Sequence, residues 1–307
     1  MSNVRSDRPQ YAEAGKGEDE GVGKSAGKGT GDDPGAADAE RAPGELEQQE
    51  YERFKRQAAK TKRYVTLVQL AIVASGLGLW ELAGRLRWIN VLLFSYPSKI
   101  GELLAQKFVD GSIYPHIGAT LLETIIGFTL GTLLGVALAA LIWWSPFLAR
   151  VVDPFIVVLN SMPKVALGPL FIVGLGPGVW SIIAMTLAIT VIITTLVVYT
   201  SFKETDANYI KVIRLLGGNR RHVFGHAIWP SAVPTMVAAL KVNVGLAWVG
   251  VIVGEFLVSR QRLAYLIIYG FQVFNFTLVI GSLVLIAVIA TAMYQAVALL
   301  ERKLSRR

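Results

Sequence analysis

The sequence predicts an all-α integral membrane protein with about six transmembrane helices. Hydrophobic residues make up 53% of the 307 residues and charged residues only 17%, a balance that indicates a membrane protein and not a soluble domain. The apolar residues are also gathered into long blocks instead of being spread at globular spacing. The absence of cysteine excludes disulfides, thiolate metal sites and cysteine nucleophiles.

Six segments are apolar enough, or nearly so, to cross a bilayer, which takes about 20 apolar residues in a helix. They comprise residues 65–83, 121–144, 155–175, 180–199, 236–258 and 278–300. The third contains Pro163, Lys164 and Pro169. We therefore expect a broken or re-entrant helix there, whose freed backbone groups are satisfied by neighbouring helices.

Residues 1–50 differ in composition from the rest of the chain. They hold nine glycines, one aromatic residue, six basic residues and twelve acidic residues. Such a segment cannot bury enough apolar surface to offset its ordering entropy. We expect a disordered, acidic, glycine-rich tail before a transmembrane domain that spans residues 51–307.

The basic residues of this domain predict its orientation, because Lys and Arg are enriched on the cytoplasmic side. With both termini on one side, that side receives 16 Lys and Arg residues near the spans and the other side receives six. We therefore expect both termini and the polar segment 202–234 to be cytoplasmic. Topology accounts for the basic surplus without a nucleic-acid partner, and we predict none.

The polar segment 202–234 begins with a predicted amphipathic helix. Thr205 or Asp206 can cap its start. Tyr209, Ile213 and Leu216 then fall on one face by 3- and 4-residue spacing. The helix is therefore expected to present an apolar face.

The second half of the segment is expected to turn back into the membrane. Lys211 and Arg214 lie off the apolar face, and Gly217-Gly218 ends the helix because glycine adopts the left-handed conformation that a helix end needs. A second short helix over 220–228 leads to Pro230. The segment is either a docking element for a partner in water or an interfacial helix lying on lipid headgroups.

Three motifs together resemble the permease subunits of binding-protein-dependent ABC importers, in the nitrate/sulfonate/taurine-type branch. The segment 160–170, NSMPKVALGPL, with Gly174-Leu175-Gly176 after it, resembles the third-span signature of that family. Gly217 and Pro230 stand where the cytoplasmic loop motif of the family has its Gly and Pro. The branch also has a Gly-Leu-Ala-Trp run leading to a Glu, which is similar to residues 245–248 and Glu255.

The resemblance implies a type I ABC importer permease-like fold and the transport of a small solute, either a nitrate/sulfonate/taurine-like anion or a vitamin-precursor-like compound. ATP would be bound and hydrolysed by partner subunits, so this chain would have no catalytic residue, no cofactor and no metal. The implied partners are ABC ATPase subunits, a second permease copy, giving a homodimer, an extracytoplasmic solute-binding protein and membrane lipid. The implied location is the cell membrane of a prokaryote.

By the same resemblance, the loop 202–234 docks the ATPase. The residues expected to carry this role are Asp206, Tyr209, Lys211, Ile213, Arg214, Leu216, Gly217 and Pro230. The chain departs from the family at the positions that name the motif, because Lys211-Val212-Ile213 stand where Glu-Ala-Ala is expected. The acidic contact that the family often offers its ATPase is missing, which implies a divergent ATPase or a different pairing.

Polar residues within the apolar segments are candidates for the translocation path, because they are costly in lipid. Glu255 either lines or gates the path, or is a structural partner of Lys241, Asn243 or Arg260. Glu123 is expected near an interface.

A second group of path candidates lies beside the two prolines of the third span. Asn160, Ser161 and Lys164 either bind solute groups at a half-helix end or satisfy a kinked backbone. Elsewhere, Gly127, Gly131 and Gly135 recur every four residues in the second span. They predict a face of close helix packing.

Two other classes of function compete with the importer. A proton-coupled secondary transporter or channel, acting without an ATPase, would explain six spans and Glu255 but not the Gly217 and Pro230 of the loop. Such proteins usually carry an internal repeat, and none is evident. A membrane scaffold or sensor is the third alternative.

Overall fold

The computed structural model describes residues 43–258 and 260–304, and the predicted tail at 1–42 lies outside them. Within this part of the chain all regular elements are helices. The chain divides into two compact units, Met1–Leu70 and Ala71–Arg307. The first helix, α1 (Pro43–Arg85), begins eight residues before residue 51, where the transmembrane domain was expected to start, and continues into the second unit.

Five helices match predicted spans, because each is long and apolar enough to cross a membrane. They are the apolar part of α1, residues Phe54–Arg85, together with α4 (Tyr114–Trp144), α7 (Val179–Lys203), α10 (Trp229–Val258) and α12 (Phe276–Leu304). Together with the bent helix pair described next, the described residues hold five to six candidate spans. The predicted all-α membrane fold with about six spans is thus confirmed.

The predicted break in the third span is present. Helix α5 (Pro146–Ser161) and the segment Lys164–Leu175 meet at an angle of 95°. That segment consists of a 3-10 turn, Lys164–Leu167, and helix α6 (Gly168–Leu175). The bend occurs because Met162 is extended, as a residue before proline is expected to be.

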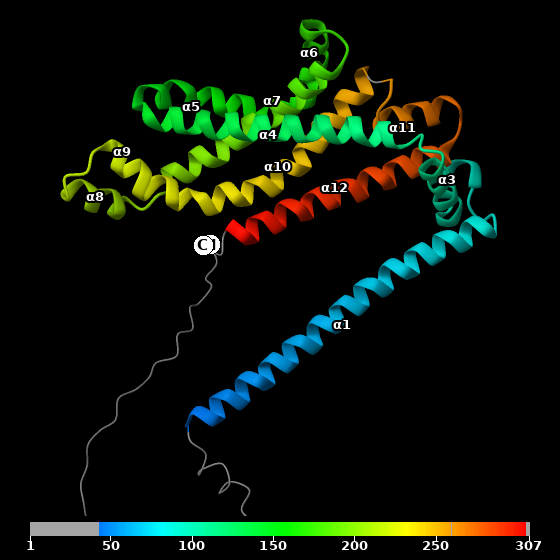
Figure 1. Ribbon diagram of the computed structural model, residues 1–307, viewed down its shortest axis with the longest axis horizontal. Coiled ribbons are helices and arrows are strands. Elements are labelled where there is room, and N and C mark those ends of the chain that lie inside the picture. Colours follow the sequence, from blue (N-terminus) through cyan, green and yellow to red (C-terminus); the bar gives the residue numbers. More distant parts are fainter. Residues whose placement is uncertain (1–42, 259, 305–307) are drawn as a thin grey trace, which may run out of the picture. The chain divides into compact units, whose positions relative to one another are not determined.

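Short helices lie at the two ends of the second unit (Figure 1). Helices α8 (Ala207–Leu215) and α9 (Arg220–Val223) lie at one end, here called the loop end. Helices α2 (Val91–Phe94), α3 (Pro97–Val109) and α11 (Leu263–Gln272) lie at the opposite end, here called the far end. Helices α4 and α10 run between the two ends, α7 runs from the region of α6 to the loop end, and α12 extends from the far end toward the loop end (Figure 1).

Helix α7 packs along both α4 and α10, and its contact with α4 is the most extensive in the fold. Three glycines of α4 face three threonines of α7 at intervals of four residues: Gly127 meets Thr186, Gly131 meets Thr190 and Gly135 meets Thr194. A Cβ atom added to any of these glycines would lie 2.5 to 2.7 Å from the facing threonine side chain. The predicted packing face is therefore confirmed, and it allows the two backbones to approach closely.

The Gly131→Leu variant should be destabilised, because a side chain at this position must displace Thr190 or separate α4 from α7. Overpacking of this kind costs about 1–3 kcal/mol. We expect a lower midpoint of thermal unfolding in detergent and less protein in the membrane. Gly118→Ala on the same helix is the control, because its Cβ would meet nothing within 4 Å. Equal stability of the two variants would contradict this packing.

Candidate functional site

The polar segment between α7 and α10 is organised around α8. The Asp206 carboxylate accepts the backbone N–H of Asn208 at 2.8 Å and so caps the start of the helix. Thr205, the alternative cap, has its hydroxyl 2.8 Å from the hydroxyl of Ser231 instead. Thr205 thereby connects the start of α8 to the first turn of α10.

The end of α8 is a Schellman motif, which requires both of its glycines. The Gly218 N–H donates to the carbonyl of Ile213 at 2.8 Å, and the Gly217 N–H donates to the carbonyl of Arg214 at 3.0 Å. Gly217 has φ +80°, the left-handed region, whereas a Cβ at Gly218 would lie 2.6 Å from the Ile213 carbonyl oxygen. The glycine pair therefore fixes the direction in which the chain leaves α8.

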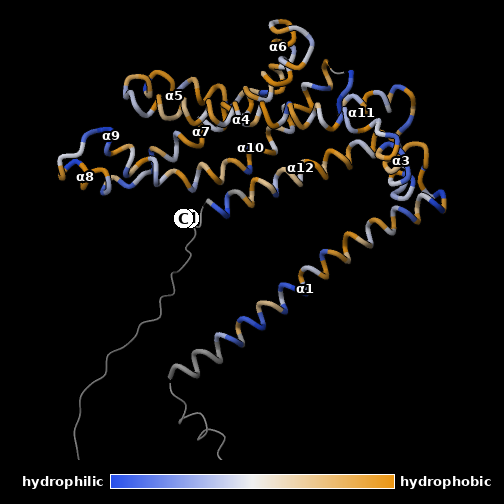
Figure 2. Tube along the Cα trace, in the orientation of Figure 1, coloured by the Kyte–Doolittle hydropathy of each residue, from blue (hydrophilic) through white to orange (hydrophobic). Residues whose placement is uncertain are grey.

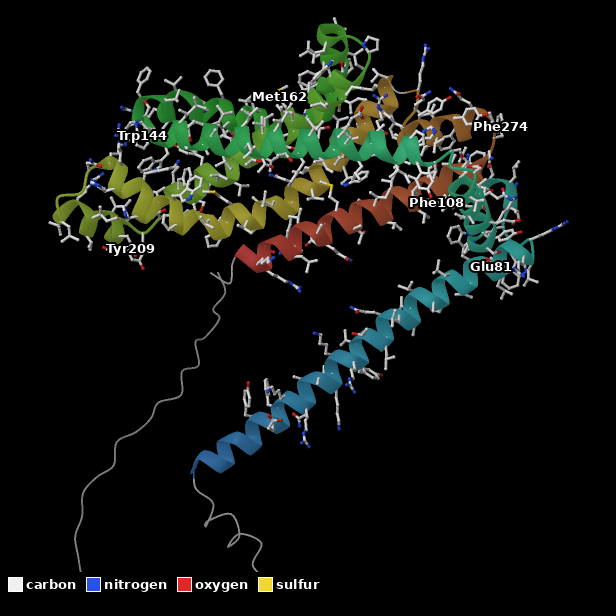
Figure 3. All side chains as sticks on the ribbon, in the orientation of Figure 1. Glu81, Phe108, Trp144, Met162, Tyr209 and Phe274 are labelled. Atoms are coloured by element: carbon white, nitrogen blue, oxygen red, sulfur yellow. The ribbon has the colours of Figure 1, made fainter. Side chains whose placement is uncertain are left out.

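The apolar side chains of α8 are divided between two faces. Ile210 and Ile213 are half-buried and pack against the core at the loop end. The remaining apolar residues of the helix and its end are exposed and are here called the exposed α8 face: Tyr209, Val212, Leu215 and Leu216, with Leu215 87% and Leu216 83% accessible. Tyr209 extends away from the bundle in Figure 3, and Figure 2 shows hydrophobic positions on α8 beside hydrophilic ones.

The sequence-based grouping of Tyr209, Ile213 and Leu216 on one face was thus wrong for Ile213. The loop-end core needs an apolar contact from α8, and Ile213 provides it together with Ile210. Lys211 and Arg214 are exposed, as their positions off the apolar face predict. The surface that α8 presents is therefore apolar with a basic border.

The loop is shorter than the predicted 202–234. Phe202 belongs to α7 and is only 1% exposed, and α9 continues through a π-helical turn, Phe224–Ile228, into α10. The result is one continuous helix from Arg220 to Val258, with no break at Pro230. In the wide turn the Trp229 N–H donates to the Phe224 carbonyl five residues earlier, and such a turn accommodates a residue without an N–H.

An aromatic cluster at the loop end joins the ends of three long helices. Phe224, in the π-helical turn, is surrounded by rings at centroid distances from 5.0 to 5.9 Å. They belong to Trp143 and Trp144 of α4, Phe202 of α7 and Trp229 of α10. The loop is thereby attached to α4 and α7 as well as to α10.

A buried polar cluster lies near the far end, where α11 begins. Glu255 of α10 is fully buried, and its carboxylate accepts the backbone N–H of Ala264 at 3.0 Å. The hydroxyl of Thr120, on α4, accepts the N–H of Leu263 at 3.1 Å. These two contacts satisfy N–H groups in the first turn of α11, which have no partner within the helix.

The same end of α11 is held by a buried ion pair. Nε and Nη2 of Arg262 lie 2.8 and 2.7 Å from Oε1 of Glu123, whose side chain is only 3% exposed. Nδ1 of His116 lies 3.2 Å from the Arg262 carbonyl oxygen. His116, Thr120 and Glu123 lie on one face of α4 at 4- and 3-residue spacing, so the start of α11 lies along two turns of α4.

None of the three residues that the sequence offered as structural partners of Glu255 is paired with it. Lys241 forms an ion pair with Glu301 of α12, and Asn243 donates to the hydroxyl of Thr194 on α7 at 2.7 Å. Arg260 is exposed. Glu255 instead accepts from the backbone of α11 and contacts the hydroxyl of Thr120, and the sequence predicted neither partner.

Arg262 is the partner of Glu123, which the sequence did not predict. Arg262 is one of the six Lys and Arg residues that the orientation argument assigns to the side opposite the termini, although a carboxylate in an apolar segment also needs a cation at a similar depth. Arg260 and Arg262 are the cations that follow the fifth span directly. Their position after the fifth span indicates that one of them pairs with a carboxylate in the bundle, but it does not decide which arginine does so.

The polar residues at the break of the third span bond to their own backbone. The Lys164 ammonium group donates to the carbonyl of Asn160 at 2.8 Å, and the Ser161 hydroxyl donates to the carbonyl of Val157 at 2.9 Å. The Lys164 contact satisfies a carbonyl in the last turn of α5 that the break leaves without a helical partner, and the Ser161 contact adds a hydrogen bond to a carbonyl one turn back. The geometry fits the backbone-satisfying interpretation of these residues.

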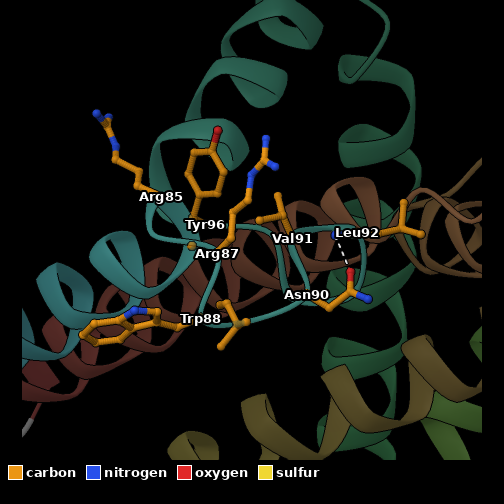
Figure 4. Close-up of a pocket in the computed structure, with 9 residues that line it drawn as sticks. Arg85, Arg87, Trp88, Asn90, Val91, Leu92 and Tyr96 are labelled. Atoms are coloured by element: carbon orange, nitrogen blue, oxygen red, sulfur yellow. Dashed lines mark hydrogen bonds between the residues drawn. The ribbon is translucent and has the colours of Figure 1, made fainter.

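A polar pocket of about 780 Å³ lies between the end of α1 and α3 at the far end. Its lining includes Arg85, Arg87, Trp88 and Tyr96, and Arg85, Arg87 and Tyr96 point to the same side in Figure 4. Trp88 is 72% exposed. Arginine and tryptophan together are typical of the water interface of a membrane.

Comparison with known families gives the class of the protein. Residues 131–306, more than half of the chain, match the family described as the binding-protein-dependent transport system inner membrane component. The chain belongs to this family. It is a permease of an ABC importer, and the predicted nitrate/sulfonate/taurine-type branch is confirmed. Such a permease is a non-catalytic membrane subunit, and ATP is hydrolysed by a partner ATPase.

Individual relatives cover most of the membrane part. A formylaminopyrimidine transport permease protein of Halalkalibacterium halodurans is 31% identical over 188 residues, which cover 61% of this chain and 74% of that protein. A putative aliphatic sulfonates transport permease protein of Bacillus subtilis is 26% identical over 246 residues, covering 79% of this chain and 88% of that protein.

Solved structures support the fold. A chain of the methionine ABC transporter MetNI, in an inward-facing conformation, superposes with a TM-score of 0.54 at 18% identity. The match covers 64% of this chain and 97% of that chain. The predicted type I importer permease fold is thus confirmed.

The Arg262→Met variant should be strongly destabilised, because it leaves the Glu123 carboxylate buried without its cation. Breaking a buried ion pair from one side costs about 3–5 kcal/mol. The double variant Glu123→Gln/Arg262→Met removes both charges and should recover much of that loss. Thermal unfolding of the purified permease measures both effects. A double variant as unstable as the single one would contradict a direct pairing.

Proposed function

We propose that this permease docks its ATPase through the exposed α8 face and forms the translocation path for a small solute. The observation that carries the proposal is the exposure of Tyr209, Val212, Leu215 and Leu216 on a helix fixed at both ends. Isolated exposed apolar residues are ordinary, whereas a contiguous apolar surface marks an interaction site. Rigid fixation of α8 would allow a partner's movement to reach the spans as a rigid-body shift.

The chemistry of the docking surface implies a matching surface on the partner. Lys211 and Arg214 border the exposed α8 face, and Lys211 stands where the family motif has its Glu. We propose that the ATPase offers an apolar cleft with an acidic rim. Charges at the rim would speed association and select which ATPase binds, whereas the apolar residues would supply most of the affinity.

We propose that the full transporter contains two copies of this permease, two ATPase subunits and an extracytoplasmic solute-binding protein in a prokaryotic cell membrane. One chain offers one docking loop, whereas two ATPases must close on each other. The solute-binding protein would approach the far end, where the pocket with Arg87 and Trp88 is open. The relatives' names favour an organic or inorganic anion, or a vitamin precursor, as the solute.

The double variant Leu215→Ala/Leu216→Ala should lose its ATPase while remaining in the membrane. Apolar interface anchors contribute about 2 kcal/mol or more each, whereas these two side chains stabilise the folded permease little because they are exposed. The measurement is the amount of ATPase that co-purifies per permease in mild detergent, together with the mass of the complex. Lys211→Ala is the matched control and should have a smaller effect.

Gly217→Val tests the direction of α8 by an independent change. A β-branched residue at φ +80° costs about 1–2 kcal/mol and would turn the exposed α8 face away from its partner. ATPase recovery should fall while the amount of inserted permease stays near normal. If both loop variants retained the ATPase at the unmutated level, the interpretation of α8 as an interfacial helix on lipid would be preferred.

The orientation we propose places both termini and α8 in the cytoplasm. Because the chain lacks cysteine, single substitutions can be labelled cleanly in intact cells. Ser112→Cys, an exposed position at the far end, should react with a membrane-impermeant maleimide from outside. Asn208→Cys, exposed on α8, should react only after permeabilisation. The reverse pattern would overturn the orientation.

A further inference from the structure

We propose that Arg220 is a positioning residue that links the coupling movement to α4, so that the ATPase acts on two spans and not on α10 alone. This inference rests on the proposed function, since it assumes that the ATPase moves α8. Its basis is a contact between residues 77 positions apart in the sequence, at the point where the loop enters the long helix.

Arg220 caps the end of α4. Its Nη2 donates to the carbonyl oxygen of Trp143 at 2.9 Å, and its guanidinium group lies 5.2 Å from the centre of the Trp143 ring. Trp143 is the penultimate residue of α4, where carbonyl groups have no partner within the helix. A cation at this end also interacts favourably with the helix dipole. The contact therefore joins Arg220 to both the backbone and the side chain of α4.

The backbone around Arg220 is fixed by its own cap. Oδ1 of Asn219 accepts the N–H groups of Arg221 and His222 at 3.0 and 3.1 Å. The Asn219 N–H donates in turn to Nδ1 of His222 at 3.2 Å, which completes a capping box. Because this cap starts the helix that includes α10, Arg220 moves as part of that helix.

The movement of α8 can therefore reach the spans along two connections. The first is covalent, from Gly217 through Asn219 into the continuous helix Arg220–Val258. The second crosses from Arg220 to α4 and is supported one turn later by Phe224, whose ring lies 5.0 Å from that of Trp143. Such contiguous contacts between rigid elements carry energetic coupling. The π-helical turn that begins at Phe224 is a feature frequently found at functional sites.

The experiment measures the movement of each span in the complex with its co-purified ATPase. Pairs of spin labels would be placed at exposed positions of the cysteine-free chain. One pair joins Leu141 of α4 to Leu299 of α12, and the other joins Val242 of α10 to the same Leu299. Distance distributions would be compared with and without ATP, using a hydrolysis-deficient ATPase to hold the ATP-bound state.

In the unmutated complex we expect ATP to change both distances. In Arg220→Ala we expect the α4 change to be reduced, because only the Phe224 contact with α4 remains, while the α10 change and ATPase recovery stay at the unmutated level. Arg220→Lys, which keeps the charge but not the planar donor fork, should retain more of the α4 change than Arg220→Ala does. Arg221→Ala, a neighbouring exposed basic residue, is the control and should behave like the unmutated complex.

The outcomes separate this inference from the proposed function. If Arg220→Ala keeps the full α4 change, or if it loses the ATPase while Arg221→Ala does not, Arg220 is not a link to α4 and the inference is overturned. If the unmutated complex forms no ATPase contact through α8, or ATP changes neither distance, the proposed function fails first. A reduction confined to the α4 change supports the inference.

Discussion

The close approach of α4 to α7 is the contact on which the rest of the structure depends. Gly127, Gly131 and Gly135 remove the side chains that would keep the two helices apart. Lipid tails are as apolar as the helix surfaces, so close packing, and not burial from water, must hold them together. Because α7 also packs along α10, α7 lies between α4 and the helix that enters from the loop. Both polar anchoring points lie on α4, with Arg220 meeting one end and Arg262 meeting the other.

Several of the charged and polar contacts in the second unit satisfy helix ends. Asp206 caps the start of α8, Arg220 caps the end of α4, and Glu255 caps the start of α11. The reason is physical, since unpaired backbone groups at helix ends are costly wherever water is excluded. This explains why a fully buried carboxylate such as Glu255 is retained without facing an open path. The arrangement favours its structural interpretation over a gate.

The sequence predicted the features that follow from local chemistry. The spans, the break at Pro163 and the turn at Gly217 arise from apolar length, proline geometry and glycine freedom, which act within a few residues. The features that it did not predict depend on distant partners. Ile213 turns inward because the core at the loop end requires it, and Pro230 stays helical because the π-helical turn accommodates it. The choice of Arg262 over Arg260 is set by where α11 packs, information that spacing alone does not contain.

The departure of Lys211-Val212-Ile213 from the Glu-Ala-Ala pattern becomes intelligible in this structure. Of the three positions, Lys211 and Val212 face outward and Ile213 faces the core. An isoleucine at the inward position adds apolar contact that fixes α8 more firmly to the bundle. The outward positions give a cation and an apolar side chain beside Leu215 and Leu216. If α8 docks the ATPase as proposed, Lys211 in place of the family's Glu requires a partner whose rim carries the opposite charge, because an unmatched rim charge would meet like charge. The charges at this rim would then decide which ATPase the permease binds. The Arg220 contact with α4 is not part of the exposed α8 face, so it would be the same with any ATPase.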